Sequence, residues 1–580
     1  MYRLTKSLCR TSTSYYYGRS VQIKNQEEKQ MKGKKVKKLI AFVAAVTVAA
    51  GSMAGCSGKE KEAKKEEKIA NIAMSSEPDN IDGSRGDSSA KGAIILEVQE
   101  SLLRMDENGE TQPAGAESWE ISEDGLVYTF KIRDNKYSDG TKVLAEDYAN
   151  CLIRTLDPEV ASTYAANYYF IKGAEAYNTG KGSEEEVGIK ALDESTLEIT
   201  LNQPVPYFLK MMTSNQFTPI PKKHTEGEKN VTYGADAENM SFSGPFMIEK
   251  WTRGEGFTLK KNPEYWDTDS VKLDGVNFLL VQEQNTQQQM FEQGKLDLIE
   301  NVPAEYYDKV KGKIDSGDIK LVEWPKPSVL YLTFNNQDPE GIFSNAKIRQ
   351  AFSLAIDREL YFEKVVKKDS VAYGLIPPAT SIGDEKFRDN HEEPLLALKD
   401  QDPKKLLEEG LKEIGREGEQ IEITYLQGDA NNNTKVRSEF FQNQWETKLG
   451  VKVKIDTAAD NATFNNMVNK GEYQVCNTGW GADYNDPMTF MKIFTSDDSN
   501  NNPKYSNPEY DELVNACMSE TDMKVREEKF AEAEKILLED AAIAPLNFGL
   551  QKNLVQKRLE GVTFSGLGGP DVELKKADIK

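Results

Sequence analysis

The chain has 580 residues, a formal net charge of -22 at neutral pH and a mean hydropathy of -0.62. This length predicts two or more domains, each large enough for its own core. The hydropathy excludes a bundle of membrane helices, and the acidic charge disfavours nucleic acid and anionic lipid as partners. Such acidity favours cationic ligands at long range, although salt screens the attraction.

The N-terminal pattern predicts an export signal. Residues 31–38 are strongly basic, and residues 39–55 form a small, apolar run that is too short for a good permanent anchor. The run ends in Met53-Ala54-Gly55-Cys56, which resembles a bacterial lipobox. We therefore expect residues 31–55 to be a lipoprotein signal peptide and Cys56 to carry the lipid. The alternative is a buried cysteine in a membrane helix.

The segments on either side of this signal have simpler interpretations. Residues 1–30 contain scattered charges and Tyr15-Tyr16-Tyr17 without periodicity, and they fit no export signal. We interpret them as an upstream extension, with Met31 as the true start. Residues 56–68 are almost all Lys, Glu and Ala after the first few positions, which is typical of a solvated tether.

From residue 69 onward, strand and helix patterns alternate, which predicts an α/β protein whose sheets are faced by helices. In the first half of the chain the predicted elements are a strand at 69–74, a helix at 94–103, an alternating strand at 126–133 after the Asp124-Gly125 turn, a helix from 145 that ends before 157, a hairpin at 244–261, a strand at 276–281 and a helix at 285–293. In the second half they are a helix at 345–357, strands at 421–426 and 451–455, and helices at 436–449 and 524–538.

The most informative stretch follows an alternating strand pattern at 473–478. It is Gly479-Trp480-Gly481-Ala482-Asp483-Tyr484-Asn485-Asp486-Pro487, whose composition predicts a loop at the end of that strand. A carboxylate beside an indole is a good receiver for an ammonium group, because the ring excludes water and its face attracts cations. The alternative is a core tryptophan at Trp480 and a turn-capping aspartate at Asp483.

At least six separated segments carry a family resemblance, among them residues 479–487, residues 116–133 (Ala-Glu-Ser-Trp-Glu-Ile-Ser-Glu-Asp-Gly-Leu-Val-Tyr-Thr-Phe-Lys-Ile-Arg) and residues 204–208 (Pro-Val-Pro-Tyr-Phe). They resemble the oligopeptide-binding proteins that feed ABC importers, in the extracellular solute-binding protein family 5. The resemblance covers essentially residues 69–580. It implies a two-lobed type II periplasmic-binding-protein fold with an additional small subdomain.

The resemblance also implies roles for particular residues. Asp483 would bind the α-ammonium group of a peptide, with Trp480, Gly479 and Tyr484 as further ligand-binding residues. Tyr164 lies in a segment whose tyrosine lines the peptide cleft in the family, although ordinary packing is the alternative for this residue.

The predicted division of the chain follows from the same resemblance. Lobe I is residues 69–322 together with 547–580, lobe II is residues 323–546, and the subdomain within lobe I is about 102–230. The chain would cross between the lobes near 321–327 and again near 543–548, and these crossings would act as a hinge.

The function implied is capture of short peptides on the outer face of the bacterial cell membrane and delivery to the importer's permease subunits, with the protein a lipid-anchored monomer. A different solute, or a peptide signal read by a receptor, is the alternative within this class. Between Gly471 and Ala482 there is no Lys, Arg or His, although basic residues near this strand help to receive the peptide carboxylate in well-known family members. How a peptide C-terminus is held is therefore open.

An enzyme is the alternative from a different class. His224 and His391 have no evident nucleophile partner, and the sequence contains no Gly-x-Ser-x-Gly, P-loop or His-Glu-x-x-His motif. The five cysteines show neither metal-ligand spacing nor a disulfide framework. We expect no catalysis, no metal and no cofactor.

Overall fold

The computed structural model describes residues 67–86, 88–106, 109–367, 370–428, 432–564 and 572–580. The predicted signal peptide, the predicted lipidation site Cys56 and the predicted tether up to residue 66 lie outside the described residues. The first described strand, β1 (Ile69–Met74), has the predicted bounds. No helix of the described residues has the length and apolar character needed to cross a membrane.

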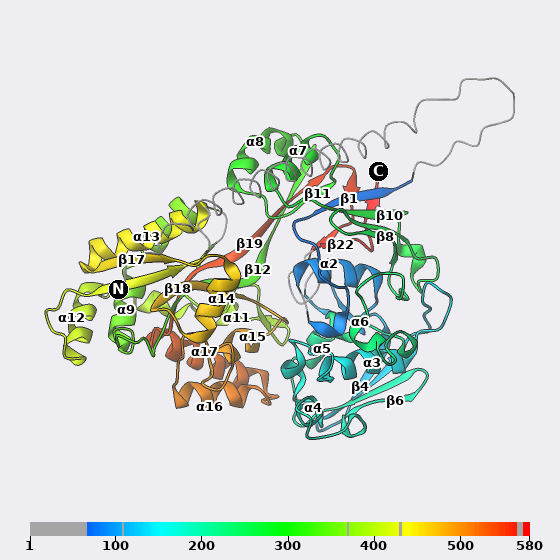
Figure 1. Cartoon of the computed structure of the whole chain (residues 1–580), viewed down its shortest axis with the longest axis horizontal. Helices are drawn as coiled ribbons and strands as arrows, with labels where there is room; N and C mark the ends of the chain where they lie inside the picture. The colour runs from blue at the N-terminus through cyan, green and yellow to red at the C-terminus, as the bar shows by residue number, and fades with distance from the viewer. Residues whose placement is uncertain (1–66, 87, 107–108, 368–369, 429–431, 565–571) are drawn as a thin grey trace, which may run out of the picture. The chain divides into compact units, whose positions relative to one another are not determined.

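An 11-stranded mixed sheet organises the described chain (Figure 1). Its strand order is β17-β16-β18-β12-β19-β11-β1-β10-β9-β8, and β13 joins β19 from outside this path. The bounds are β8 (Phe246–Thr252), β9 (Gly256–Lys261), β10 (Gly275–Leu280), β11 (Leu298–Ile299), β12 (Ile319–Phe334), β13 (Ser370–Val371), β16 (Glu422–Gln427), β17 (Lys452–Thr457), β18 (Val475–Gly481) and β19 (Ile543–Gln556).

The two long strands β12 and β19 run antiparallel to each other and belong to both lobes. Their pairing runs from Ile319 opposite Gln556 to Pro325 opposite Leu550, and resumes at Val329 opposite Phe548. The shift coincides with Pro325 and Pro327, which cannot donate a backbone N–H to the ladder. On the side of the break where Ile319 lies, β19 pairs with β11. On the side where Phe334 lies, β12 pairs with β18. The break therefore lies in the segment predicted to cross between lobes.

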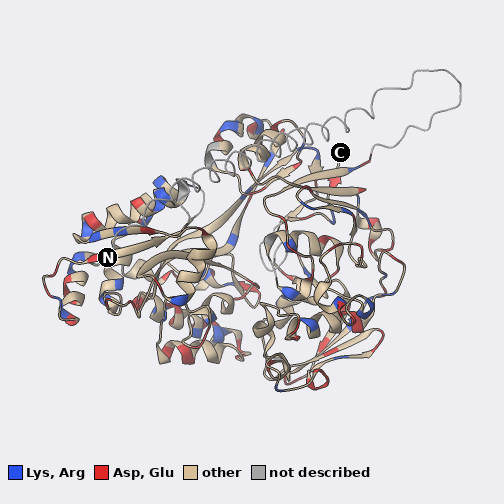
Figure 2. Cartoon of the chain, viewed as in Figure 1, with Lys and Arg blue, Asp and Glu red and all other residues tan. Residues whose placement is uncertain are grey.

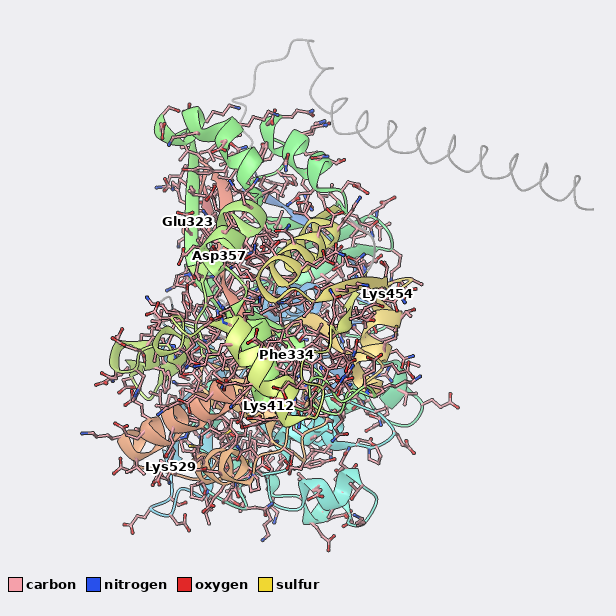
Figure 3. All side chains as sticks on the ribbon, turned by 90° about the vertical axis from the view of Figure 1, so that its left-hand side faces the viewer. Glu323, Phe334, Asp357, Lys412, Lys454 and Lys529 are labelled. Atoms are coloured by element: carbon pink, nitrogen blue, oxygen red, sulfur yellow. The ribbon has the colours of Figure 1, made fainter. Side chains whose placement is uncertain are left out.

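Figure 3 labels two residues of β12 on either side of this break. Glu323 lies near the helices drawn in green, α7 (Gln284–Glu292) and α8 (Ala304–Asp315), and Phe334 lies among the helices of lobe II. The side chains of Phe334 and Ile319, at opposite ends of the strand, accordingly pack in two different hydrophobic cores.

In lobe II, helices cover the sheet where β16, β17 and β18 lie. The helix α13 (Asn432–Leu449) packs on β16 and β17, and α9 (Ala346–Leu354) packs on α12 (Pro403–Glu413). Trp445 is fully buried and donates from its indole Nε1 to the carbonyl of Phe352, 2.9 Å away. The helix predicted at 436–449 is confirmed, although it begins earlier, at Asn432, and its large apolar side chains form part of the core of this lobe.

The subdomain has its own four-stranded sheet, ordered β4-β5-β7-β6, with α3 (Ala145–Leu156) packed against it. Its strands are β4 (Ala116–Ile121), β5 (Val127–Ile132), β6 (Ile189–Asp193) and β7 (Thr196–Thr200). The core of the subdomain continues into lobe II, where the ring of Tyr207 stacks on that of Tyr484 with centroids 4.8 Å apart and planes within 4°.

The helix predicted at 94–103 is wrong in its bounds. The structure has α2 at Ser89–Val98, and Gln99 is already extended. Tertiary hydrogen bonds account for the early end, because Gln99 Nε2 donates to the carbonyl of Ser241 (2.9 Å) and the N–H of Glu100 donates to Ser243 Oγ (3.0 Å). Residues 103–105 instead form β2 (Leu103–Met105), paired with β3 (Thr111–Pro113).

Acidic and basic side chains are interspersed over the described elements (Figure 2). Cys151, Cys476 and Cys517 are buried free thiols, and burial raises the pKa of Cys151 and Cys517 to about 12. Among the described residues, no group of three or more His, Cys, Asp or Glu side chains is placed to hold a metal ion.

Candidate functional site

The stretch predicted as a loop from Gly479 is a strand for its first three residues. The strand β18 continues to Gly481, with Gly479 opposite Leu330 and Trp480 opposite Val329 of β12. Local composition gave no sign of this extension, because pairing with a strand 150 residues earlier in the chain stabilises it. The loop begins at Ala482, whose N–H donates to the carbonyl of Pro327 (2.8 Å).

Asp483 is half-buried at the start of this loop and is oriented by three side chains. Its backbone N–H donates to Thr489 Oγ1 at 3.1 Å, and that hydroxyl lies 3.4 Å from Asp483 Oδ2. Trp480 Nε1 donates to the same hydroxyl at 3.4 Å, and Tyr164 OH lies 3.5 Å from Asp483 Oδ1. The indole is thus linked to the carboxylate through Thr489, and the subdomain reaches it through Tyr164.

A buried ion pair holds the far end of the loop. Arg526, on α17 (Met523–Glu539), donates from Nη1 and Nη2 to the two oxygens of Asp486, both at 2.7 Å, and is fully buried. Burial lowers the pKa of Arg526, but the Asp486 carboxylate more than offsets this and keeps that pKa above its ordinary value. A bidentate pair of this kind restricts the loop to one geometry.

A cavity of about 540 Å³ opens beside Asp483 and is lined by both lobes. Lobe II contributes Gly481 at the end of β18 and the loop residues Ala482 to Tyr484. Lobe I contributes the end of β1 with Ser75 and Ser76, and one face of α2. The subdomain contributes Tyr164, Tyr168 and Met211 among others. The walls combine apolar side chains with a few hydroxyl, amide and charged groups, as is typical of ligand sites.

The structure brings together three of the five predicted ligand-binding residues. Tyr164, Asp483 and Tyr484 line the cavity, and Tyr484 does so while stacked on Tyr207. Trp480 and Gly479 do not line it and lie next to it on β18.

Sequence reasoning missed two charged residues of the cavity wall. Lys326 lies between the two prolines of β12, and Glu300 follows β11. No local motif marks either position. Lys326 could have been found only from the Pro-Lys-Pro sequence in the predicted crossing, since that pattern interrupts a strand where a ligand could approach.

One edge of β18 is open beside the cavity. The strand β16 pairs with β18 only at Val475 and Cys476, and no described strand pairs with this side of β18 beyond Cys476. Even-numbered residues of this segment direct their backbone groups to β12, as the bonds of Gln474 O and Ala482 N–H show. The N–H and C=O groups of Gly479 and Gly481 consequently face the open edge, because backbone groups alternate sides along a strand.

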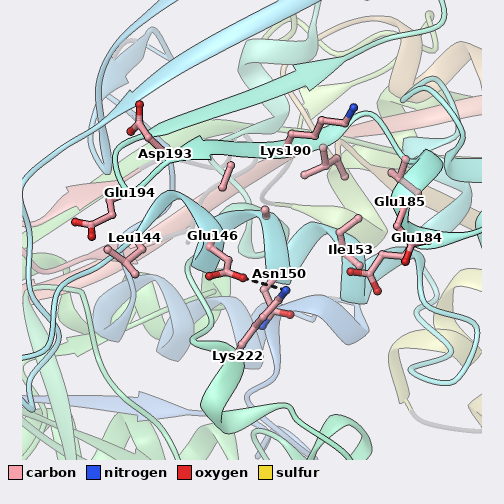
Figure 4. A pocket seen from close by; sticks show the side chains of 14 residues that line it. Leu144, Glu146, Asn150, Ile153, Glu184, Glu185, Lys190, Asp193, Glu194 and Lys222 are labelled. Carbon is pink, nitrogen blue, oxygen red and sulfur yellow. Dashed lines mark ion pairs between the residues drawn. The ribbon is translucent and has the colours of Figure 1, made fainter.

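A second cavity, of about 470 Å³, lies on the subdomain alone, between α3 and β6 (Figure 4). Acidic side chains dominate its charged groups, and Lys222 pairs with Glu146 at 3.0 Å with both side chains about half exposed. Lobe II contributes nothing to it. It therefore lacks the converging groups from two lobes that distinguish the cavity at Asp483.

Two lobes joined by two crossing strands, with a cavity between them that is open to a strand edge, define a solute-binding protein rather than a single-domain receptor. The chain belongs to the bacterial extracellular solute-binding proteins, family 5, whose model matches residues 110–502.

Relatives and solved structures agree with this assignment. The oligopeptide-binding protein OppA of Bacillus subtilis is 32% identical over 527 residues, which is 89% of this chain and 93% of the relative. The substrate-binding domain of an oligopeptide ABC transporter from Bacillus anthracis is 32% identical with a TM-score of 0.72, covering 88% of this chain and 98% of that one. Peptide-bound OppA of Listeria monocytogenes is 30% identical with a TM-score of 0.72, covering 89% and 99%. The predicted family and the two-lobed periplasmic-binding-protein fold are confirmed.

Proposed function

We propose that this protein captures short peptides in the cavity at Asp483 and delivers them to an ABC importer. The observation that carries the proposal is the open edge of β18, which ends beside a half-buried carboxylate inside the cavity. The relatives support it, since several are named as oligopeptide-binding or dipeptide-binding proteins.

The edge can supply affinity that does not depend on peptide sequence. An extended peptide bonds its own N–H and C=O groups to an unpaired strand edge, whatever its side chains are. At Gly481 the absence of a side chain leaves room for the peptide backbone, since a Cβ added there would meet nothing within 4 Å. At Gly479 an added Cβ would meet Leu330 Cδ1 and the carbonyl oxygen of Val329 at 2.9 Å, so the glycine there allows close packing on β12. Side chains of the peptide would then alternate between the walls of the cavity.

Edge pairing alone does not fix where the peptide starts, so one charged anchor is required. Asp483 can accept charge-assisted hydrogen bonds from the peptide's α-ammonium group, in a site that closure of the lobes would shield from water. Tyr164 and Thr489 hold the carboxylate in place for this contact. Because the family and the relatives are named as binding proteins, we infer a binding protein without catalytic activity.

Closure and anchorage complete the proposal. The interrupted pairing at Pro325 and Pro327 supports hinge motion between the lobes as the peptide is enclosed.

A diacyl group on Cys56 would hold the protein stably at the outer face of the cell membrane, where a single acyl chain would be marginal. A Cys56→Ala variant is expected in the soluble or secreted fraction, and a variant that stays fully membrane-bound would refute the anchor.

The test of the ammonium site is a double-mutant cycle measured by calorimetry. Removing one partner of a buried charged pair costs about 2–5 kcal/mol, so Asp483→Asn should weaken binding of trialanine about 30-fold to several thousand-fold. N-acetylation of the peptide should cost the wild type a similar factor and should cost the variant little more.

Glu300→Gln is the matched control, because it neutralises the other acid of the same cavity. N-acetylation should remain costly in this variant. If the acetylation penalty disappears in Glu300→Gln and persists in Asp483→Asn, Glu300 is the ammonium site. If no peptide binds the wild type, the peptide assignment itself fails.

A further inference from the structure

A guanidinium group lies at the far end of the open edge of β18. Arg437 of α13 donates from Nη1 to Asn477 Oδ1 at 2.9 Å, and Asn477 Nδ2 donates to the carbonyl of Tyr331 at 2.9 Å. The neighbouring Ser438 donates to Gln427, the last residue of β16, at 2.6 Å. Arg437 therefore stands where β16 ends and the open edge begins.

Arg437 lacks the partners that buried arginines have. Arg526 pairs with Asp486 and Arg154 pairs with Asp82, and Arg358 donates to backbone carbonyls, whereas Arg437 has no carboxylate within 4.0 Å among the described residues. Its Nε is buried without a hydrogen-bond partner in the described part of the chain. A partly satisfied guanidinium is suited to receive an anion with planar, bidentate geometry.

The open edge of β18 determines the direction of a bound peptide and the distance between Asp483 and Arg437. A peptide that begins at Asp483 and uses the open edge must run back along β18 toward Asn477, antiparallel to the strand. Asn477 and Asp483 are six positions apart in the sequence, which is roughly 20 Å at about 3.4 Å per residue. Side-chain reach at each end shortens this to roughly 14 Å, the span of about four extended residues.

Lys326, the cation that lines the cavity, stands at the other end of the edge. Its neighbour Pro327 accepts the N–H of Ala482, so Lys326 lies across from Asp483. A carboxylate held there would leave space for only the shortest ligands. The C-terminus of a longer peptide falls at Arg437 instead.

We propose that Arg437, oriented by Asn477, receives the C-terminal carboxylate of bound peptides of about three to five residues. This inference rests on the proposed function, since it needs a peptide anchored at Asp483. It answers how the C-terminus is held in a chain whose strand β18 itself carries no basic residue. The cation comes from α13, a separate element that the ends of β16 and β18 bring alongside the edge.

The experiment compares polyalanine peptides of two to six residues with free and amidated C-termini, by calorimetry on the intact mature protein. For the wild type, amidation of tetra-alanine should weaken binding about 10- to 100-fold, the range for a hydrogen bond to a charged group. In Arg437→Gln the free peptide should bind about as weakly as the amide does to wild type, and amidation should change Kd less than about 2-fold. Dialanine should show a much smaller amidation penalty.

Two further variants separate this role from a structural one. Asn477→Asp places a carboxylate beside Arg437 and should reproduce the effect of Arg437→Gln while the thermal melting temperature is maintained. Lys326→Gln removes the other cation of the site and should keep the full amidation penalty.

The outcomes distinguish this inference from the function on which it rests. An amidation penalty that is unchanged in Arg437→Gln, or that disappears in Lys326→Gln, overturns the role of Arg437. If N-acetylation still matters through Asp483 in the same experiment, the peptide-binding function stands and only the carboxylate site is refuted. If wild type binds none of the peptides, both are refuted.

Discussion

Buried charged side chains lie on both sides of the cavity, and the two sides differ in the number of acids relative to bases. In lobe II a single acid, Asp486, meets a single base, Arg526, through two hydrogen bonds of 2.7 Å. This pair fixes the end of the loop that begins with Asp483. Each of these two buried charges has its complement.

In lobe I the acids outnumber the base. Glu100 accepts from Arg104 Nε at 2.6 Å, and Glu573 accepts from the same guanidinium, which leaves Glu97 as an additional acid. Glu97 accepts the N–H of Leu574 at 2.7 Å, but its Oε2 is buried without a partner among the described residues. Burial and the nearby Glu573 raise the pKa of Glu97 to about 8.

The additional acid makes the lobe I wall sensitive to pH. With a pKa of about 8, Glu97 is largely protonated at neutral pH and loses its proton as the pH rises through about 8. Leu96, beside Glu97, and Val572, beside Glu573, both line the cavity. Alkaline pH should therefore loosen the lobe I wall.

The largest expected effect comes from breaking the balanced pair. Asp486→Asn leaves Arg526 charged, buried and without its carboxylate, and this should lower the free energy of unfolding by about 3–5 kcal/mol in urea titrations. A double variant, Asp486→Leu with Arg526→Met, should recover much of the loss, because apolar replacement removes both desolvated charges. Equal stability of the single variant and the wild type would contradict the importance of this pair.

An intermediate effect is expected from neutralising the additional acid. Because the folded state holds the Glu97 proton at pH values where the unfolded chain releases it, the stability of the wild type should fall as pH rises from about 4.5 to about 8. Glu97→Gln should flatten this slope and make the protein about 1–3 kcal/mol more stable than wild type at pH 9, with little difference at pH 5.

The control for this prediction is Glu100→Gln, which removes a hydrogen-bond partner of Arg104 and should destabilise the protein at every pH. Thermal unfolding measured from pH 5 to pH 9 separates the two variants. A Glu97→Gln variant that keeps the wild-type slope would show that another group titrates.

The smallest effect is expected at the hydroxyl that joins Trp480 to Asp483. Thr489→Val removes the acceptor for Trp480 Nε1 and for the Asp483 N–H, so it should cost about 1 kcal/mol of stability and weaken trialanine binding about 3- to 10-fold. Trp480→Phe removes only the indole donor and should weaken binding less. An effect of Thr489→Val as large as that of Asp483→Asn would mean that the hydroxyl itself binds the ligand.

Local sequence patterns predicted most of the elements that build the two lobes. The strand at 69–74 has its predicted bounds, and α3 ends before Asp157-Pro158 as the proline requires. The helices predicted at 436–449 and 524–538 correspond to α13 and α17. These segments succeed because their periodicity and their end signals lie within the segment itself.

The resemblance to a family supplied what periodicity could not, namely the two lobes and the importance of residues 479–487. It placed Tyr164 and Asp483 in one site although 319 positions separate them, and the structure brings them within 3.5 Å. Their roles as ligand-binding residues stay a prediction, as do the predicted lobe boundaries.

The sequence by itself therefore determined the class of fold, the family, the main helices and strands, and the acid on which the proposed site depends. Tertiary structure alone decided that α2 ends at Val98, because its next residues bond to Ser241 and Ser243. It also decided that Gly479 to Gly481 form a strand with one open edge, since their partner is β12 and β16 stops at Gln427. Arg437 became a candidate for the same reason: its guanidinium reaches Asn477 from another helix, and such proximity depends on packing between elements that are distant in sequence.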